Sequence, residues 1–193
     1  MDTKVVIVVH SGYGHTAKVA ESVRTGVGTV PAVDAEIVAV DELIAASEGP
    51  TWDKLAAADA IVFGTPTYMG NVAAAFKQFM DMSSGVWLAQ GWAGKLAAGF
   101  TNSGSPSGDK VNTLESLVIF ASQHGMTWTP TGVPLDHEHG INRLGGFLGL
   151  MTQSDHAPAD VTPPEVDHET ARRFGAHVAR SAKRWKAGAQ AVG

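Results

Sequence analysis

The residues from Val5 to Ala17 constrain the fold of this chain more than any other segment. Val5–Val9 is an uninterrupted run of β-branched residues, which is typical of a strand buried on both faces of a parallel sheet. The next residues, Ser11–Thr16, contain two glycines and two hydroxyl side chains and lead into a helical pattern. Backbone N–H groups and the helix dipole at such a point attract an anion, and the glycines let the backbone approach it closely. The segment therefore predicts a phosphate-binding loop in an α/β protein.

The loop does not belong to a nucleoside triphosphatase, because no Gly-Lys-Ser/Thr sequence follows it. We therefore expect a cofactor with a monophosphate or diphosphate group. Gly12–Ala17 also satisfies the dinucleotide fingerprint, and Asp41 could bind a ribose, so a Rossmann dehydrogenase is an alternative. Ser11 and Thr16 around the glycines favour a monophosphate. An ordinary turn between a strand and a helix is the structural alternative.

Composition limits the remaining possibilities. A chain of 193 residues with 44% hydrophobic residues predicts a single domain over residues 1–193. The absence of cysteine excludes disulfides, thiolate metal sites and thiol nucleophiles. A net charge of −5 argues against nucleic-acid binding. No apolar run reaches the length of about 18 residues that a membrane span needs, and the amino terminus lacks a signal-peptide pattern, so we expect a cytoplasmic location.

Strand and helix patterns alternate along the chain. This alternation predicts a right-handed, doubly wound parallel sheet whose ligand lies at the carboxyl ends of the strands. The last helix should place Phe174, Val178, Ala182 and Trp185 on one face. Thr131–Pro164 is too long for a simple connection and is expected to be functional. The expected strands are Val5–Val9, Glu36–Val40, Ala60–Gly64, Lys95–Thr101 and Met126–Thr129, and the expected helices are Thr16–Val27, Asn71–Met82, Lys110–His124 and Asp167–Lys186.

Two further loops should meet the phosphate-binding loop at that edge of the sheet. Gly64–Asn71 contains Tyr68 and Met69, which offer flat, polarizable surface to an aromatic ring system. Thr101–Gly108 is rich in small residues whose N–H and hydroxyl groups suit carbonyls and ring nitrogens. A hydrolase interpretation of this loop fails, because Pro106 occupies the nucleophile position of Gly-x-Ser-x-Gly.

Four segments together, Ser11–Thr16, Pro66–Asn71, Thr101–Ser105 and His124–Met126, resemble the flavodoxin-like NAD(P)H:quinone oxidoreductases of the WrbA type. The match extends over most of residues 4–130. The resemblance implies a flavodoxin-like, five-stranded parallel sheet of order 2-1-3-4-5 with helices on both faces.

The same resemblance implies an FMN whose phosphate lies on residues 11–16 and whose ring is held by residues 66–70 and 103–108. It further implies NAD(P)H as co-substrate, a quinone-like acceptor and ping-pong hydride transfer. The implied cofactor-binding residues are Ser11, Gly12, Tyr13, Gly14, His15, Thr16, Pro66, Thr67, Tyr68, Met69, Gly70, Asn71, Ser103, Gly104, Ser105, Pro106, Ser107, Gly108 and His124.

The resemblance also implies roles near the substrate. A histidine at the position of His124 would act beside the flavin, while Tyr13 would line the nicotinamide site and Trp87 would border the substrate. It implies a homodimer or homotetramer whose active sites involve neighbouring subunits. Apart from the resemblance, His124 would be read as a helix cap before Gly125.

The chain departs from the family pattern at two places. Met69 replaces the usual phenylalanine, and Leu148–Thr152 stands where the family has Pro-Tyr-Gly-Ala. The sequence therefore leaves the identity of the electron acceptor open. A flavodoxin-type electron carrier without its own substrate is a second interpretation. His15 could contact the phosphate or be solvated. Asp136–His139 is read as a polar loop, because it lacks a distant third metal ligand.

Overall fold

The structure, a computed structural model, describes residues 2–192. Its centre is a parallel sheet whose strands lie in the order β2-β1-β3-β5-β6. In chain order this is the predicted 2-1-3-4-5 arrangement, and the flavodoxin-like fold class is confirmed. The five strands are β1 (Thr3–Val9), β2 (Val33–Ala39), β3 (Ala60–Tyr68), β5 (Leu96–Ser103) and β6 (Thr127–Trp128).

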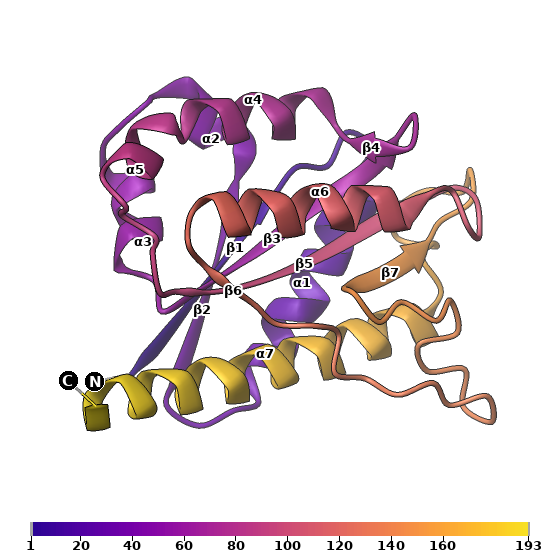
Figure 1. Cartoon of the computed structure of the whole chain (residues 1–193). Coiled ribbons are helices and arrows are strands. Elements are labelled where there is room, and N and C mark those ends of the chain that lie inside the picture. The colour runs from indigo at the N-terminus through magenta and orange to yellow at the C-terminus, as the bar shows by residue number, and fades with distance from the viewer. Residues whose placement is uncertain (1, 193) are drawn as a thin grey trace.

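Helices cover both faces of this sheet (Figure 1). One face carries α1 and the long α7, which lie against each other. The other face carries the remaining five helices. The helices are α1 (His15–Gly28), α2 (Val40–Ala45), α3 (Pro50–Ala57), α4 (Ala74–Met82), α5 (Ser84–Leu88), α6 (Lys110–Gln123) and α7 (Glu165–Val192).

The core explains why β1 consists of β-branched residues. Val5 and Ile7 pack into the hydrophobic cluster beneath α1 and α7, whereas Val6 and Val8 pack into the cluster on the opposite face. Successive side chains of a strand point to opposite faces, so a strand that is covered on both sides needs apolar residues throughout.

The last parallel strand is split into two pieces. β6 pairs with the first half of β5, and β7 (Leu150–Gln153) pairs in parallel with its second half, from Phe100 to Ser103. Residues 129–149 leave the sheet edge between the two pieces and return to it (Figure 1). The expected excursion therefore contains a strand, and it delivers residues after Gln153 to the carboxyl edge of the sheet.

Several sequence predictions were incomplete. The helix expected at Asn71 begins at Ala74, because β4 (Asn71–Val72) pairs antiparallel with the end of β3. The short helices α2, α3 and α5 were not predicted. Trp185, expected on the same helix face as Phe174 and Val178, is 44% exposed, and its indole N–H donates to the carbonyl of Gly94 at 2.7 Å. None of the helices in residues 2–192 has the length and apolar character that a bilayer span requires.

Candidate functional site

Three loops meet where β1, β3 and β5 end, and they enclose a cavity of about 320 Å³. A fourth segment, which follows β7, closes the cavity from another side. The lining residues are Ser11, Tyr13, His15, Thr16, Pro66, Thr67, Tyr68, Asn102, Ser103, Gly104, Ser154, Asp155 and His156. The convergence that the sequence predicts at this edge of the sheet is therefore present.

The first loop is built as an anion site. Gly14 takes the left-handed conformation with φ of 89° and begins α1 without a side-chain cap. The Ser11 hydroxyl oxygen accepts a hydrogen bond from the backbone N–H of Ala17 at 3.1 Å. Because a hydroxyl both accepts and donates, this bond leaves its proton available for an anion. Thr16 is only 2% exposed yet lines the cavity.

The second loop presents an aromatic wall. Tyr68 lies over the phosphate-binding loop, and its ring meets that of Tyr13 edge to face at 6.2 Å. Burial raises the pKa of the Tyr68 phenol. Thr67 is anchored from behind, because its hydroxyl lies 2.8 Å from the hydroxyls of both Thr101 and Thr113. These buried contacts fix the second loop to β5 and α6.

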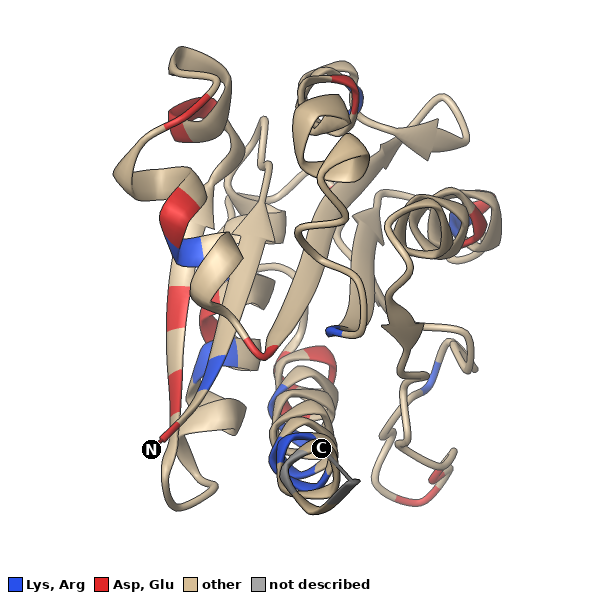
Figure 2. Cartoon of the chain, turned by 60° about the vertical axis from the view of Figure 1, so that its left-hand side comes forward, with Lys and Arg blue, Asp and Glu red and all other residues tan. Residues whose placement is uncertain are grey.

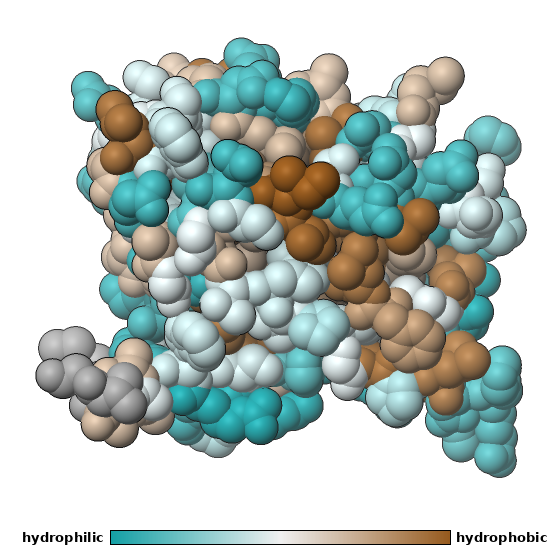
Figure 3. Space-filling view, viewed as in Figure 1, coloured by the Kyte–Doolittle hydropathy of each residue, from teal (hydrophilic) through white to brown (hydrophobic). Residues whose placement is uncertain are grey.

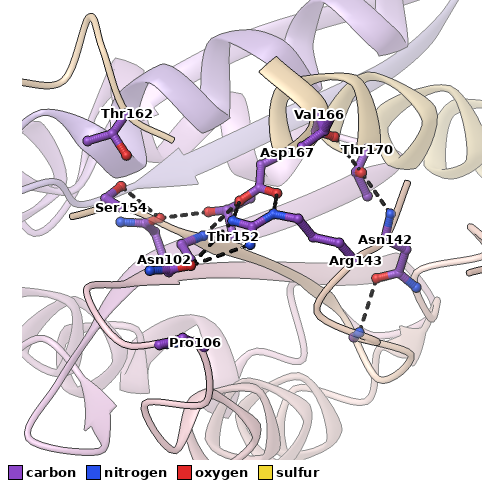
Figure 4. A network of polar contacts seen from close by, with 12 residues as sticks. Asn102, Pro106, Asn142, Arg143, Thr152, Ser154, Thr162, Val166, Asp167 and Thr170 are labelled. Atoms are coloured by element: carbon purple, nitrogen blue, oxygen red, sulfur yellow. Dashed lines mark hydrogen bonds and ion pairs between the residues drawn. The ribbon is translucent and has the colours of Figure 1, made fainter. Parts of the chain in front are cut away.

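The third loop is joined to β7 by a buried polar network (Figure 4). The Asn102 side-chain oxygen accepts from the Thr152 hydroxyl at 2.9 Å and from the Ser154 hydroxyl at 3.1 Å. Behind the loop, Lys110 donates to Ser103 and to loop carbonyls. Neither Asn102 nor Lys110 was among the predicted site residues.

The fourth segment lies in Thr131–Pro164, which was expected to be functional, but none of its residues was among the predicted site residues. Ser154, Asp155 and His156 line the cavity, and Ala157 and Ala159 then lie against the phosphate-binding loop. The His15 Nε2 atom lies 2.9 Å from the carbonyl oxygen of Ala157, so His15 ties the two loops together. The only sequence signal for this segment is the length of the connection before the last helix.

Other predicted residues, in the β3–β4 hairpin and the outer part of the third loop, are not among those that line the cavity. Met69 is fully exposed at the tip of the β3–β4 hairpin, where it has φ of 49°. Gly70 and Asn71 contact α6, because Asn112 donates to the Gly70 carbonyl at 2.7 Å and Ser116 donates to the Asn71 side chain at 2.9 Å. The residues Ser105, Pro106, Ser107 and Gly108 form the partly exposed outer turn of the third loop.

Comparisons with known proteins agree with this geometry. A family model described as NADPH-dependent FMN reductase matches residues 49–140. The chain is 32% identical to an NAD(P)H dehydrogenase (quinone) of Trichlorobacter lovleyi and 38% identical to the flavodoxin FldP of Pseudomonas aeruginosa. Each alignment covers 92% of this chain and 96% of the relative. The crystal structure of a flavodoxin, WrbA-like protein from Agrobacterium tumefaciens superposes with a TM-score of 0.73 at 40% identity, over 95% of this chain and 99% of that one.

This chain belongs to the WrbA-type family of flavodoxin-like FMN reductases. FMN is the cofactor that the family assignment supports, with NAD(P)H as the electron donor. The cavity fits this cofactor. It offers backbone and hydroxyl donors at the start of α1 for a phosphate, and tyrosine surface beside small residues for a flat ring.

Two residues that the family resemblance implicates are not at this cavity within one chain. His124 and Trp87 line a different hollow of about 420 Å³ between α4, α5 and α6. His124 follows the carboxyl end of α6, beside the amino end of β5, whereas the cavity lies at the carboxyl end of β5. Their predicted roles at the cofactor stay predictions and need a second copy of the chain.

His124 is held firmly where it lies. It is 3% exposed, its ring packs 4.4 Å from that of Trp92, and its Nε2 atom lies 2.9 Å from the Ser83 hydroxyl. Burial lowers its pKa to about 4, so the ring is neutral at pH 7. Among the described residues, its Nδ1 atom is buried without a hydrogen-bond partner.

The acidic and imidazole groups at residues 136–139 form a local pair. The Asp136 carboxylate lies 2.9 Å from the His139 ring, and this contact lowers the pKa of Asp136. Within residues 2–192, no cluster of three potential metal ligands is present.

Proposed function

We propose that this protein is an FMN-dependent oxidoreductase that transfers hydride from NAD(P)H to a quinone or a similar small acceptor by a ping-pong mechanism. The main support for this proposal is the cavity where the three loops meet, because it combines an anion site at the start of α1 with an aromatic wall. When bound, FMN supplies the hydride chemistry, and the protein supplies position and electrostatics.

Different residues around the cavity would bind different parts of the cofactor. Ser11 and Thr16 would donate to the phosphate, together with backbone N–H groups at the start of α1. Tyr68 would flank the ring, while Ser103 and Gly104 would bind its polar edge. Tyr13 is 78% exposed beside Tyr68, which suits a role in lining the nicotinamide site.

Electron transfer between protein partners, as in a flavodoxin, is the second candidate. The 38% identical relative named as a flavodoxin favours it. A carrier usually presents a face of one charge sign to its partners. Acidic and basic residues are interspersed here along β2, β1 and α3, where Lys54 pairs with Glu36 (Figure 2). We therefore place the enzyme first.

Steady-state and rapid kinetics separate the two candidates. If the protein is an enzyme, NADH or NADPH should reduce its bound FMN under anaerobic conditions within the time of one turnover. Steady-state measurements with a quinone should then give parallel double-reciprocal lines. A yellow protein that neither nucleotide reduces would be a carrier. Intersecting lines with a demonstrated ternary complex would contradict the ping-pong mechanism.

We also propose that a second copy of the chain completes the active site. Trp87 and Leu88 on α5 are exposed. Figure 3 shows more apolar surface, in brown, over α6 and the segment after β6, where Ile119, Leu135 and Phe147 are exposed. Covering these side chains would favour a homodimer or homotetramer.

Mixing two variants tests this shared site. His124→Ala should slow quinone reduction by about a hundredfold if the imidazole stabilises charge that develops at the cofactor, because one such donor contributes about 3 kcal/mol. Gly12→Asp should lose FMN. If the site is shared, co-refolded mixtures should recover activity that neither variant has alone. Absence of recovery, together with a monomeric mass by light scattering, would contradict the proposal.

A further inference from the structure

Lys110 is a buried lysine directly behind the third loop. It is the first residue of α6 and only 1% exposed. Its Nζ atom donates to the Ser103 hydroxyl at 2.8 Å, to the Ser105 carbonyl at 2.7 Å and to the Pro106 carbonyl at 3.0 Å. An ammonium group has three donors, and this loop occupies all of them.

The charge of Lys110 has no direct counterion in the described part of the chain. The carboxylate of Asp167 on α7 attracts the ammonium but is already bound by Arg143, with Nε–Oδ1 at 2.7 Å and Nη2–Oδ2 at 3.0 Å (Figure 4). Asp167 also accepts the backbone N–H of Gln153 at 2.9 Å. The neighbouring Asp109 is exposed to solvent.

This arrangement is costly for a structural lysine. Burying a cation without an ion pair carries a desolvation penalty, which a neutral side chain would avoid. The penalty is visible in the pKa of Lys110, which burial lowers to about 8. The ammonium is nevertheless the dominant form at pH 7, and Ser103, its hydroxyl partner, lines the cavity.

We propose that Lys110 is a positioning residue that shapes the Ser103–Pro106 loop and whose positive charge favours the reduced state of the cofactor. The inference rests on the proposed function. Hydride transfer moves two electrons and one proton from NAD(P)H to the cofactor, and NAD(P)⁺ leaves. The cofactor therefore gains one negative charge, which a fixed buried cation behind its binding loop stabilises.

Two variants separate the charge of Lys110 from its hydrogen bonds. Lys110→Gln keeps an amide that can donate to the loop but removes the charge, and Lys110→Met removes both. Lys95→Met is the matched control, because Lys95 also donates to backbone carbonyls, those of Ala56 and Ala58, at the opposite edge of the sheet.

The main measurement is the midpoint potential of protein-bound FMN, determined by dye equilibration and absorbance. We expect both Lys110 variants to shift the reduction equilibrium by roughly tenfold toward the oxidised state, which corresponds to about 30 mV for a two-electron couple. Lys95→Met should match the wild type. FMN affinity should fall more in Lys110→Met than in Lys110→Gln, because only the former loses the loop contacts.

The pH dependence provides a second, independent readout on the unmodified protein. Burial lowers the pKa of Lys110 to about 8, and the negative charge that reduction adds to the cofactor would raise it. Above about pH 8, reduction should therefore take up an extra proton at Lys110, and the wild-type potential should fall more steeply with pH than that of Lys110→Gln. A wild-type potential without this feature, or unchanged potentials in Lys110→Gln, would overturn the inference while the proposed function stands. A wild-type protein that binds no FMN would overturn both.

Discussion

Gly12 lies directly against Tyr68, so that a methyl group on Gly12 would come within 2.6 Å of the Tyr68 hydroxyl oxygen. This contact joins the phosphate-binding loop to the aromatic wall of the cavity. The glycine is therefore required for the approach of a side chain from β3 as well as for the approach of an anion. The two loops form one surface, although 55 residues lie between Gly12 and Tyr68 in the sequence.

Gly12→Ala should weaken FMN binding while the fold stays intact. The atom in the way is the far end of a side chain, so Tyr68 can move aside without distorting the backbone. Displacing an aromatic contact costs about 0.5–1.5 kcal/mol, or roughly two- to tenfold in affinity. Fluorescence titration with FMN measures the change. Gly28→Ala is the control, since a methyl group there meets open space. Equal affinities for the two variants would contradict the prediction.

Ser11→Ala and Thr16→Val should each reduce FMN affinity by roughly ten- to a hundredfold, because a hydrogen bond to a charged group contributes about 1.5–3 kcal/mol. Ser11→Ala also removes the acceptor for the Ala17 N–H group. Thr25→Val is the control. Thr25 lies on the same helix, and its exposed hydroxyl donates only to the Glu21 carbonyl, so this variant should bind FMN normally. Unchanged titrations for Ser11→Ala and Thr16→Val would remove the loop from the site.

The parts of the fold that the sequence predicted are those with local signals. Val5–Val9 and the loop after it are consecutive residues, and the strand, turn and helix can be read from them directly. Phe174, Val178 and Ala182 follow helical spacing and are buried in α7. Trp185 follows the same spacing but is 44% exposed at the amino end of β5, where its indole N–H donates to the carbonyl of Gly94. Periodicity therefore predicts the face of a helix but not where the core beneath it ends.

The features that the sequence did not predict depend on distant pairing. β7 forms only because Leu150–Gln153 meets the free half of β5, and this pairing delivers Ser154–His156 to the cavity. β4 shortens the next helix for a similar reason, because Asn71 and Val72 pair with β3. The short helices α2, α3 and α5 have five to eight residues each, too few for a clear periodic signal.

Arg143→Met should destabilise the protein by about 3–5 kcal/mol, because it leaves the carboxylate of Asp167 buried without its ion pair. Asp167 has a side chain only 3% exposed and also holds the backbone of Gln153. Urea unfolding measures the loss. Arg24→Met is the control, since its pair with Glu21 is exposed and should contribute at most about 1 kcal/mol. Equal midpoints for the two variants would show that the network in Figure 4 does not stabilise the fold.

In the His124→Gln variant, the free energy of unfolding should depend less strongly on pH in the acid range than it does in the wild type. The wild-type imidazole has a folded-state pKa of about 4, below its usual 6.5, because burial disfavours the charged form. Between these values the unfolded chain binds more protons than the folded one, so the free energy of unfolding falls as pH drops from about 6.5 to 4.

The pKa shift of His124 contributes up to about 3 kcal/mol to the change in the free energy of unfolding. A glutamine at this position can keep the contact with Ser83 but has no group that titrates. His168 and His177 also have pKa values lowered by burial, so the slope should shrink rather than vanish. Urea midpoints at several pH values measure it, with the exposed His137→Gln as control. If His124→Gln and His137→Gln kept the same slope as the wild type, the imidazole of His124 would have to be accessible to protons in the folded protein. That result would favour a His124 imidazole that contacts solvent at an interface between two copies of the chain. It would argue against a neutral imidazole that is buried against Trp92.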